Sequence, residues 1–301
     1  MSKKIFKRVI SIVIVIAVAS GLWYFFKPYD YTVSFESITR VGTINQTLKL
    51  WDQSLKNSKI IENNSADKVK QVIQYEDYEY IYNWEFENKN DSITQIKIGI
   101  IDSKSSFSSR LNNLFGDTVI KTKTKKNITD FITVLNDHLD SHDVKIIGEA
   151  MSPEVFCAYL SFETKQMQKA NEMMKNYTFL STELLKTKVK MEGNPMVEIT
   201  NWDSSTDSIH FNFCFPIVEQ DSLPKHPAIK YKKIKSQKSL KAEYYGNYIS
   251  SDRAWYEIIY YAEKNSIKLD KKPIETYYNN PMLGGDDSHW KTEVFIPIVE
   301  N

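Results

Sequence analysis

Glu293 is the residue whose surroundings most suggest chemistry. It is the one acidic residue in the apolar stretch WKTEVFIPI, which covers residues 290–298. A carboxylate that is buried among aromatic side chains without a basic partner has its pKa raised by desolvation and attracts a ligand cation. Faces of tyrosine and tryptophan rings add cation–π attraction of about 0.5–2 kcal/mol each.

Aromatic residues that could surround this acid are numerous in the last third of the chain. We predict a ligand-binding pocket formed by Glu293 with Tyr245, Tyr248, Trp255, Tyr277, Tyr278, Trp290 and Phe295. The structural alternative is a salt bridge on an edge strand, formed with Lys291 or with a lysine of the run at 230–241, which would contribute little stability.

The strand that carries Glu293 is predicted to have two different faces. Side chains alternate along a strand, so Thr292, Val294 and Ile296 share one face while Glu293 and Phe295 lie on the other. An earlier strand places Phe211, Phe213 and Phe215 on the face that matches the first set, which indicates a core face beneath helices. Glu293 is therefore expected to point to the opposite face, into a cleft or a second layer.

An internal repeat defines the elements around this strand. The segment NPMVE (194–198) followed by IHFNFCFPIVE, which ends at residue 219, matches KKPIE (271–275) followed by HWKTEVFIPIVE, which ends at residue 300. This alignment equates Glu198 with Glu275 and Asn212 with Glu293, and gives the second copy four more loop residues. Glu198 and Glu275 both begin strands and are expected to be solvated.

A strand and an amphipathic helix precede each copy, so both halves, about 143–220 and 228–301, are predicted to be βαββ units. Strands are expected at about 144–163 and 230–248.

Two such units in tandem resemble the GyrI-like domain, the effector-binding domain of bacterial multidrug-responsive transcription activators. The resemblance covers about 143–301 and is carried by YYGNY (244–248), AWYEIIYYAEKN (254–265), IETYYNNP (274–281) and WKTEVFIPI (290–298). It implies an antiparallel sheet and, at the position of Glu293, a glutamate in an aromatic pocket for cationic or amphipathic ligands. Some relatives are hydrolases that use a pocket glutamate with a tyrosine. No helix-turn-helix segment precedes the domain, so we expect no nucleic acid partner.

Residues 29–142 are predicted to form a separate α+β domain. The strand YTVSF, the helix GTINQTLKLWDQSL, the strands YNWEF and NDSITQIKIGI, the segment SRLNNLF and a final helix to about residue 142 follow one another. This order resembles an SRPBCC, or polyketide-cyclase-like, helix-grip domain, in which a long helix lies across a curved sheet. The resemblance implies an apolar cavity and no shared catalytic residue.

The N-terminal segment, residues 1–28, is predicted to be a membrane anchor. Its stretch VISIVIVIAVASGLWYFF, residues 9–26, holds no charge and follows four cations. The length is just enough to span a bilayer, and the basic flank predicts a cytoplasmic N-terminus with the body on the outer side. Residues 17–19, AVA, resemble a signal-peptide cleavage site, so a cleaved signal is the alternative. We favour the anchor because the apolar run continues into an aromatic cluster.

Composition limits the possible partners. Lys and Arg number 39 and Asp and Glu number 38, but five of the cations lie at or before residue 27, which leaves 39 − 5 = 34 cations against 38 acids. A mildly acidic body argues against nucleic acid binding. The two cysteines, Cys157 and Cys214, form neither a zinc site nor a disulfide framework and are expected to be buried thiols. A disulfide between them is the alternative in an oxidising compartment.

No metal or cofactor is expected, because His138 and His142 lie four residues apart on a predicted helix but lack a third ligand.

Together these observations predict a membrane-anchored α+β protein that binds a small hydrophobic or cationic molecule. The alternatives are a hydrolase that uses Glu293 and Tyr277, and a non-catalytic envelope interaction protein. No G-x-S-x-G elbow, metal cluster or phosphate loop in the sequence supports another chemistry.

Overall fold

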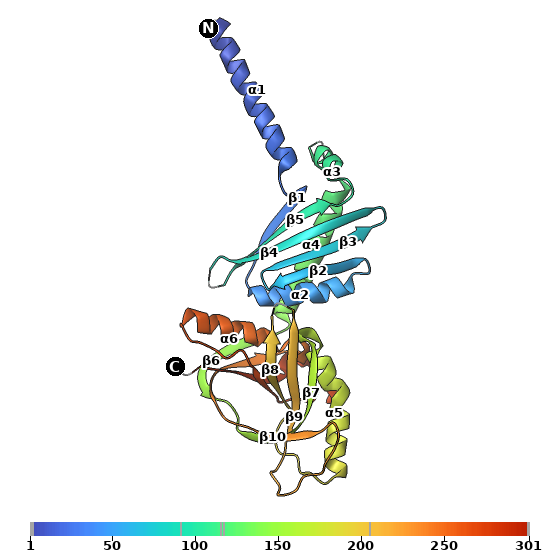
Figure 1. Cartoon of the computed structure of the whole chain (residues 1–301), viewed down its shortest axis with the longest axis vertical. Helices are drawn as coiled ribbons and strands as arrows, with labels where there is room; N and C mark the ends of the chain where they lie inside the picture. Colours follow the sequence, from blue (N-terminus) through green and yellow to red (C-terminus); the bar gives the residue numbers. More distant parts are fainter. Residues whose placement is uncertain (1–2, 91, 115, 117, 205, 300–301) are drawn as a thin grey trace. The chain divides into compact units, whose positions relative to one another are not determined.

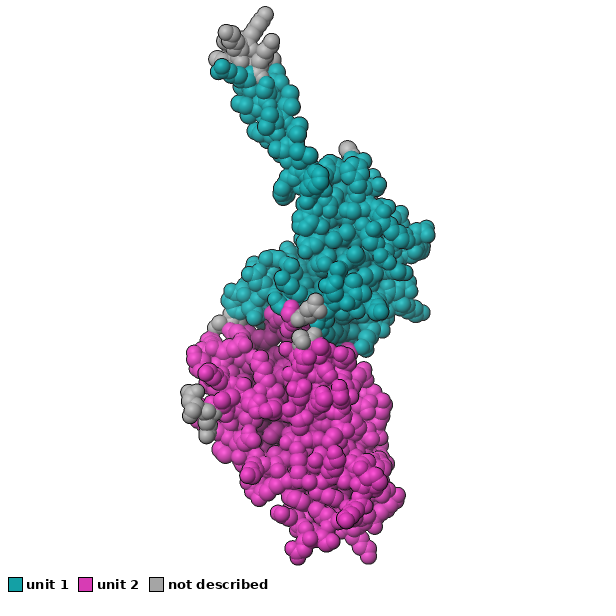
Figure 2. Space-filling model, in the orientation of Figure 1, with its two compact units in different colours: residues 1–38, 48–63, 67–133 teal, residues 39–47, 64–66, 134–301 magenta. Residues whose placement is uncertain are grey.

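The computed structural model describes residues 3–90, 92–114, 116, 118–204 and 206–299. The chain divides into two compact units (Figure 2). The first comprises residues 1–38, 48–63 and 67–133, and the second comprises residues 39–47, 64–66 and 134–301. Each unit is described by itself.

The chain begins with the apolar helix α1, Lys3–Phe26 (Figure 1). Its segment Arg8–Phe26 has 19 residues with a mean hydropathy of 2.4, and none of it is buried in the protein. This helix is long and apolar enough to cross a membrane, and a signal sequence would have the same properties.

The first unit contains a five-stranded sheet in the order β1-β5-β4-β3-β2. The strands β1, β5, β4 and β3 pair antiparallel along this order. The elements from residue 31 to residue 140 are β1 (Tyr31–Ser37), α2 (Val41–Ser54), β2 (Ser58–Ser65), β3 (Lys68–Tyr75), β4 (Tyr78–Asn88), β5 (Thr94–Asp102), α3 (Ser106–Asn113) and α4 (Val119–Asp140). Residues 41–47 of α2, 64–65 of β2 and 134–140 of α4 are assigned to the second unit.

Aromatic side chains pack between α4 and this sheet. The Phe131 ring lies 5.4 Å from that of Trp51 and 5.0 Å from that of Trp84, and all three residues are buried. Trp51 Nε1 also donates to Asp130 Oδ2 at 2.7 Å. The order of strands and helices is the one expected from the sequence, while the SRPBCC resemblance of this unit stays a prediction.

The second unit is built on an eight-stranded sheet in the order β10-β7-β9-β8-β12-β13-β11-β6, with antiparallel pairing at each neighbour. Helix α5 packs on β7 and β9 (Figure 1), and helix α6 packs on β11, β6 and β13. The elements are β6 (Asp143–Met151), β7 (Val155–Lys165), α5 (Lys169–Lys186), β8 (Met196–Asp203), β9 (Ser208–Pro216), β10 (Lys230–Ile234), β11 (Lys238–Tyr245), α6 (Arg253–Lys264), β12 (Ile274–Tyr277) and β13 (Lys291–Pro297). The chain is therefore mixed α+β with antiparallel sheets, as predicted.

Two of the expected strands are each divided in two. The strand expected at 144–163 is β6 followed by β7, and the strand expected at 230–248 is β10 followed by β11. The first break contains Pro153, which has no backbone N–H to donate to a strand neighbour. The members of each pair then lie far apart in the sheet, because β6 and β10 form its two edges.

The two faces of the sheet carry different clusters. Phe211, Phe213, Phe215, Val294 and Ile296 belong to the main core with the buried residues of α5 and α6, on the face that the alternation predicted. The other face carries a smaller buried cluster formed by Cys157, Met196, Cys214, Ile234, Ile274 and Phe295. Both cysteines are free thiols and fully buried.

The junction between β8 and β12 corrects the register of the internal repeat. Here Ile274 pairs with Glu198, Glu275 with Val197 and Thr276 with Met196. Outward from this junction the order is β8-β9-β7 on one side and β12-β13-β11 on the other. Symmetric pairing makes Val197, not Glu198, the counterpart of Glu275.

This one-residue shift moves Glu275 to the other face of the strand. The expectation that Glu275 is solvated is wrong, because its exposed fraction is 0%. Glu198 lies on the opposite face, half-buried, where its carboxylate pairs with Lys232.

Candidate functional site

A cavity of about 300 Å³ lies on the core face of the second unit. Its walls come from α5, from the turn at 247–249, from the end of β12 and from the segment that leads to β13. The lining is mostly apolar and aromatic and consists of Ala170, Met173, Met174, Tyr177, Pro195, Phe213, Asn247, Tyr248, Ile249, Tyr277, Asn279, Pro281 and Trp290.

Tyr248 is the central aromatic residue of this lining. Its ring centroid lies 4.7 Å from that of Tyr277, edge to face, and 5.3 Å from that of Trp290. Its hydroxyl accepts from the backbone N–H of Asn279 at 2.8 Å and donates to the Asn279 carbonyl at 3.2 Å. Burial raises the pKa of Tyr248 to about 12, so the hydroxyl is neutral near pH 7.

The turn before Tyr248 depends on a glycine and an amide. Gly246 has a φ of 149°, and a Cβ there would lie 2.6 Å from the Tyr244 hydroxyl oxygen. The Asn247 side chain accepts from the Ile249 N–H at 3.0 Å and so begins the short 3-10 helix at Tyr248–Ser250. The sequence YYGNY therefore fixes the position of Tyr248.

Glu275 lies directly behind the cavity wall. Its carboxylate accepts from the hydroxyl of Tyr277, which lines the cavity, and from Trp255 Nε1 at 2.7 Å. It also forms a buried ion pair with Lys169, the first residue of α5. Ser251 Oγ lies 3.2 Å from Glu275 Oε2 and 2.9 Å from Lys169 Nζ.

The ammonium of Lys169 balances the carboxylate of Glu275, and the protonated hydroxyl of Tyr277 adds no charge. Burial, followed by the negative charge of Glu275, raises the pKa of Tyr277 well above its ordinary value. Tyr277 therefore stays protonated and donates to Glu275. Each oxygen of the buried carboxylate has hydrogen-bond donors, which is the condition under which a buried charge is tolerated.

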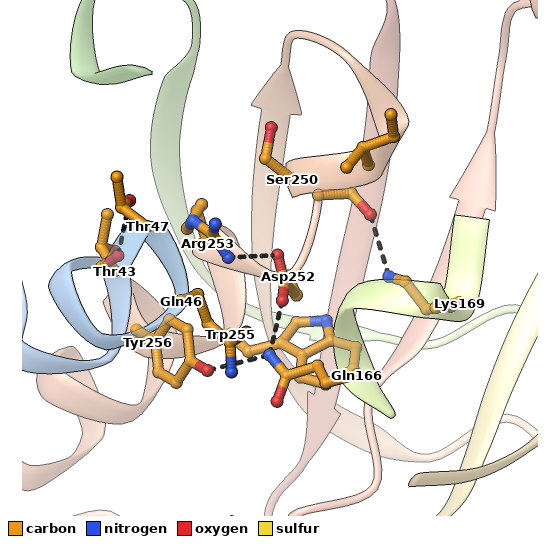
Figure 3. A network of polar contacts seen from close by, with 12 residues as sticks. Thr43, Gln46, Thr47, Gln166, Lys169, Ser250, Asp252, Arg253, Trp255 and Tyr256 are labelled. Carbon is orange, nitrogen blue, oxygen red and sulfur yellow. Dashed lines mark hydrogen bonds and ion pairs between the residues drawn. The ribbon is translucent and has the colours of Figure 1, made fainter. Parts of the chain in front are cut away.

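A second polar network holds α6 against the start of α5 (Figure 3). Gln166, which precedes α5, donates through Nε2 to Asp252 and to the Tyr256 hydroxyl, the latter at 2.8 Å. Arg253 Nη1 donates to the other Asp252 oxygen at 2.8 Å. These bonds hold α6, which carries Trp255, against the start of α5, which carries Lys169. Figure 3 shows Trp255 and Lys169 next to this network.

The aromatic residues predicted for the pocket divide into three groups. Tyr248, Tyr277 and Trp290 line the cavity. Trp255 lies one layer behind it and donates to Glu275. The remaining three lie elsewhere: Tyr245 donates to Glu243, Tyr278 is 45% exposed, and Phe295 belongs to the cluster on the opposite face.

The structure corrects the expected surroundings of Glu293, which was predicted to lie in an aromatic pocket. The residue is on the face opposite the cavity, as the alternation predicted, but that face holds basic partners for it. Its Oε1 lies 2.9 Å from Lys241 Nζ and 3.0 Å from Lys291 Nζ. Burial acts to raise the pKa of Glu293, and hydrogen bonds from Lys241, Lys291 and Tyr278 outweigh it and hold the pKa below its ordinary value.

The salt-bridge alternative therefore describes Glu293, with one difference: β13 is an interior strand between β12 and β11, not an edge strand. Tyr277 lies on the cavity face and Glu293 pairs across with Thr276, so the acid–base pair of Glu293 and Tyr277 is not formed.

Glu275 and Lys169 are the residues that sequence reasoning missed. The signal for Glu275 was present in an alignment shifted by one residue, in which Pro195 matches Pro273 and Val197 matches Glu275. An acid in place of a core-face valine is a candidate site residue. Lys169 had no comparable signal, because its partner is 106 positions away in the sequence.

Comparison with known proteins agrees with this fold. The family model described as GyrI-like small molecule binding domain matches residues 154–299. No curated protein matches the chain.

Among solved structures, the EcmrR C-terminal domain is 16% identical, with 53% of this chain and 99% of that chain covered and a TM-score of 0.44. EcmrR in its DNA complex is 15% identical, with 66% and 73% covered and a TM-score of 0.44. SAV2435 bound to tetraphenylphosphonium is 8% identical, with 52% and 93% covered and a TM-score of 0.34. Residues 154–299 of this chain are a GyrI-like domain.

Proposed function

We propose that the cavity beside Tyr248 binds a small apolar molecule. The observation that carries this proposal is the lining, in which aromatic and aliphatic side chains enclose about 300 Å³ inside a small-molecule binding domain. Cavities of this size with few polar groups are typical ligand sites. Glu275 takes the place of Glu293 as the acid next to the site.

Asn247, Asn279 and Tyr248 of the lining are already engaged within the protein. Asn247 Nδ2 donates to Asp287 at 2.8 Å, and Asn279 Oδ1 accepts from the Lys291 N–H at 2.9 Å. The Tyr248 hydroxyl is held by the backbone of Asn279. Few polar groups of the lining are therefore left to form hydrogen bonds with a polar ligand. This supports an apolar ligand.

The test is binding of N-phenyl-1-naphthylamine, an uncharged fluorescent probe, to the fragment 29–301, which lacks α1. Ala170 lines the cavity from α5, so Ala170→Phe is expected to fill it and to weaken probe binding at least tenfold. The matched control is Glu293→Gln on the opposite face, which is expected to bind as the wild type does. Near-UV circular dichroism of each protein checks that the fold is kept. Wild-type affinity in Ala170→Phe, or lost affinity in Glu293→Gln, would contradict the proposal.

Hydrolysis is the second candidate, and one observation favours it. The Tyr277 hydroxyl, at the cavity wall, contacts the buried carboxylate of Glu275, which is an acid–base pair next to a space for substrate. Turnover of p-nitrophenyl acetate by the fragment is then expected to fall in Tyr277→Phe. The control Tyr245→Phe removes a tyrosine hydroxyl outside the lining. Equal rates in both variants would remove this candidate.

We further propose that α1 anchors the protein with its N-terminus in the cytoplasm and its body outside. The apolar segment Arg8–Phe26 and the cations before it support this orientation. The chain is expected to stay with membranes after extraction at alkaline pH, and its body to be digested by protease added to spheroplasts. Release of a shortened, soluble chain would indicate a cleaved signal instead. The absence of nucleic acid binding remains a prediction, based on the charge balance.

A further inference from the structure

The Lys169 ammonium occupies a set of groups that would suit a free organic cation. It contacts the carboxylate of Glu275 and lies 2.9 Å from Ser251 Oγ. Its Nζ is 4.7 Å from the centroid of the Trp255 ring. A carboxylate, a hydroxyl oxygen and an indole face are the partners that bind alkylammonium groups.

The site around this ammonium is closed to solvent. The exposed fractions are 1% for Lys169 and 0% for Glu275, Ser251 and Trp255. Among the described residues, Lys169 is the one cation that forms an ion pair with Glu275. The other donors to the carboxylate are Trp255, Ser251 and Tyr277, which are neutral. The charge of Glu275 is therefore balanced by Lys169 alone.

The site adjoins the cavity through two neighbours. Ala170, the next residue after Lys169, lines the cavity, and so does Tyr277, whose hydroxyl contacts Glu275. A ligand in the cavity is thus one side chain away from a carboxylate and an ammonium whose charges oppose each other. A ligand cation would meet attraction and repulsion of similar size.

We propose that Lys169 determines the charge specificity of this domain: it fills a cation site next to the cavity, so that the cavity selects uncharged ligands. This inference rests on the proposed binding function. Without the Lys169 ammonium, the same groups would bind an organic ammonium. A buried carboxylate without a cation is strongly unfavourable, and any ammonium that reaches it relieves that cost. Val197, the counterpart of Glu275, has no charge to balance, which restricts the site to one half of the domain.

The direct test is chemical rescue in the full chain, in detergent micelles at pH 8.5. Lys169→Ala removes three carbons and the ammonium, and propylammonium supplies the same atoms. The variant is expected to unfold at a lower temperature than the wild type, and propylammonium to restore its Tm with at least tenfold higher apparent affinity than propan-1-ol. Lys169→Ala/Glu275→Gln is expected to lose this preference, because the carboxylate is gone. The matched control Lys175→Ala removes an exposed lysine of the same helix and is expected to show no rescue.

Rescue of Lys169→Ala by the alcohol and the amine alike would overturn the proposal, as would a preference for the amine that survives in the double variant. If Lys169→Ala does not fold, Lys169→Met keeps the volume of the side chain. Choline and its uncharged isostere 3,3-dimethyl-1-butanol are then compared by the change in Tm.

Lys169→Met is expected to raise the affinity for choline relative to the isostere at least tenfold over the wild type, and an unchanged ratio would overturn the proposal. Failure of the uncharged naphthylamine probe to bind the wild type would instead remove the proposed function and leave the rescue result interpretable.

Discussion

His138 is half-buried next to a permanent positive charge, which predicts a loss of stability in acid. Its Nε2 accepts from Arg253 Nε at 3.0 Å, and its ring centroid lies 4.9 Å from that of His142. Asp252 pairs with Arg253, with 2.8 Å between Oδ1 and Nη1. Burial, then the charges of Arg253 and His142, lowers the pKa of His138 from 6.5 to about 3. His138 is therefore neutral in the folded protein.

The size of the effect follows from the difference between the two states. Because the folded pKa lies below the unfolded value, the contribution is complete above pH 6.5 and is lost as the pH falls toward 3. Between pH 7.5 and pH 4.5 the unfolded state gains its proton and the folded state does not. With one unit of pKa equal to about 1.36 kcal/mol, the loss by pH 4.5 is about 3 kcal/mol.

The assay compares the wild type with His138→Gln, whose Oε1 can still accept from Arg253 but does not titrate. Urea unfolding of the full chain in detergent, followed by tryptophan fluorescence, is measured at both pH values. The wild type is expected to lose about 3 kcal/mol more than His138→Gln, since all other titrating groups are common to the two. His289→Gln, at an exposed histidine, is the control and is expected to follow the wild type. Parallel losses in the wild type and His138→Gln would refute the reasoning.

Three further predictions concern the site and the opposite face of the sheet. Gly246→Ala is expected to cost about 1–3 kcal/mol in urea unfolding, because its φ of 149° and a Cβ at 2.6 Å from the Tyr244 hydroxyl are both unfavourable; an unchanged unfolding midpoint would contradict this. Trp290→Phe is expected to abolish ligand-induced quenching of tryptophan fluorescence, since Trp290 is the tryptophan in the lining; quenching that persists unchanged would place the ligand elsewhere. Cys157 and Cys214 are fully buried, so Ellman's reagent is expected to react with them only at the rate of unfolding; fast labelling of the native protein would show that this cluster is open.

The alternation of side chains predicted which face each strand residue takes. It placed Phe213 and Val294 in the core and Glu293 on the other face, and the structure has them there. It failed for Glu275 because the repeat was aligned one residue out of register at this strand, with Glu198 instead of Val197 as the counterpart of Glu275. A strand has a period of two, so a shift of one residue exchanges its two faces. Glu275, which is buried, was therefore expected to be solvated.

The contents of the site could be predicted only in part. Tyr248, Tyr277 and Trp290 were found because large aromatic residues near a predicted pocket are good candidates. Residue type could not separate them from Tyr245, whose side chain takes the other face of its strand. The ion pair of Lys169 with Glu275 joins the start of a helix to a strand in the other half of the domain, and no local pattern encodes such a contact.

The junction between β8 and β12 also has a mechanical consequence. It is made by three residue pairs, whereas β7 and β9 share nine and β11 and β13 share seven. The cavity lies across it, with Pro195 and Phe213 on one side and Tyr277 and Trp290 on the other. Pulling the sheet apart would separate it here first, because the fewest backbone hydrogen bonds resist. A bound molecule adds contacts on both sides, so slower exchange of the amide hydrogens in β12 would report directly that the cavity is occupied.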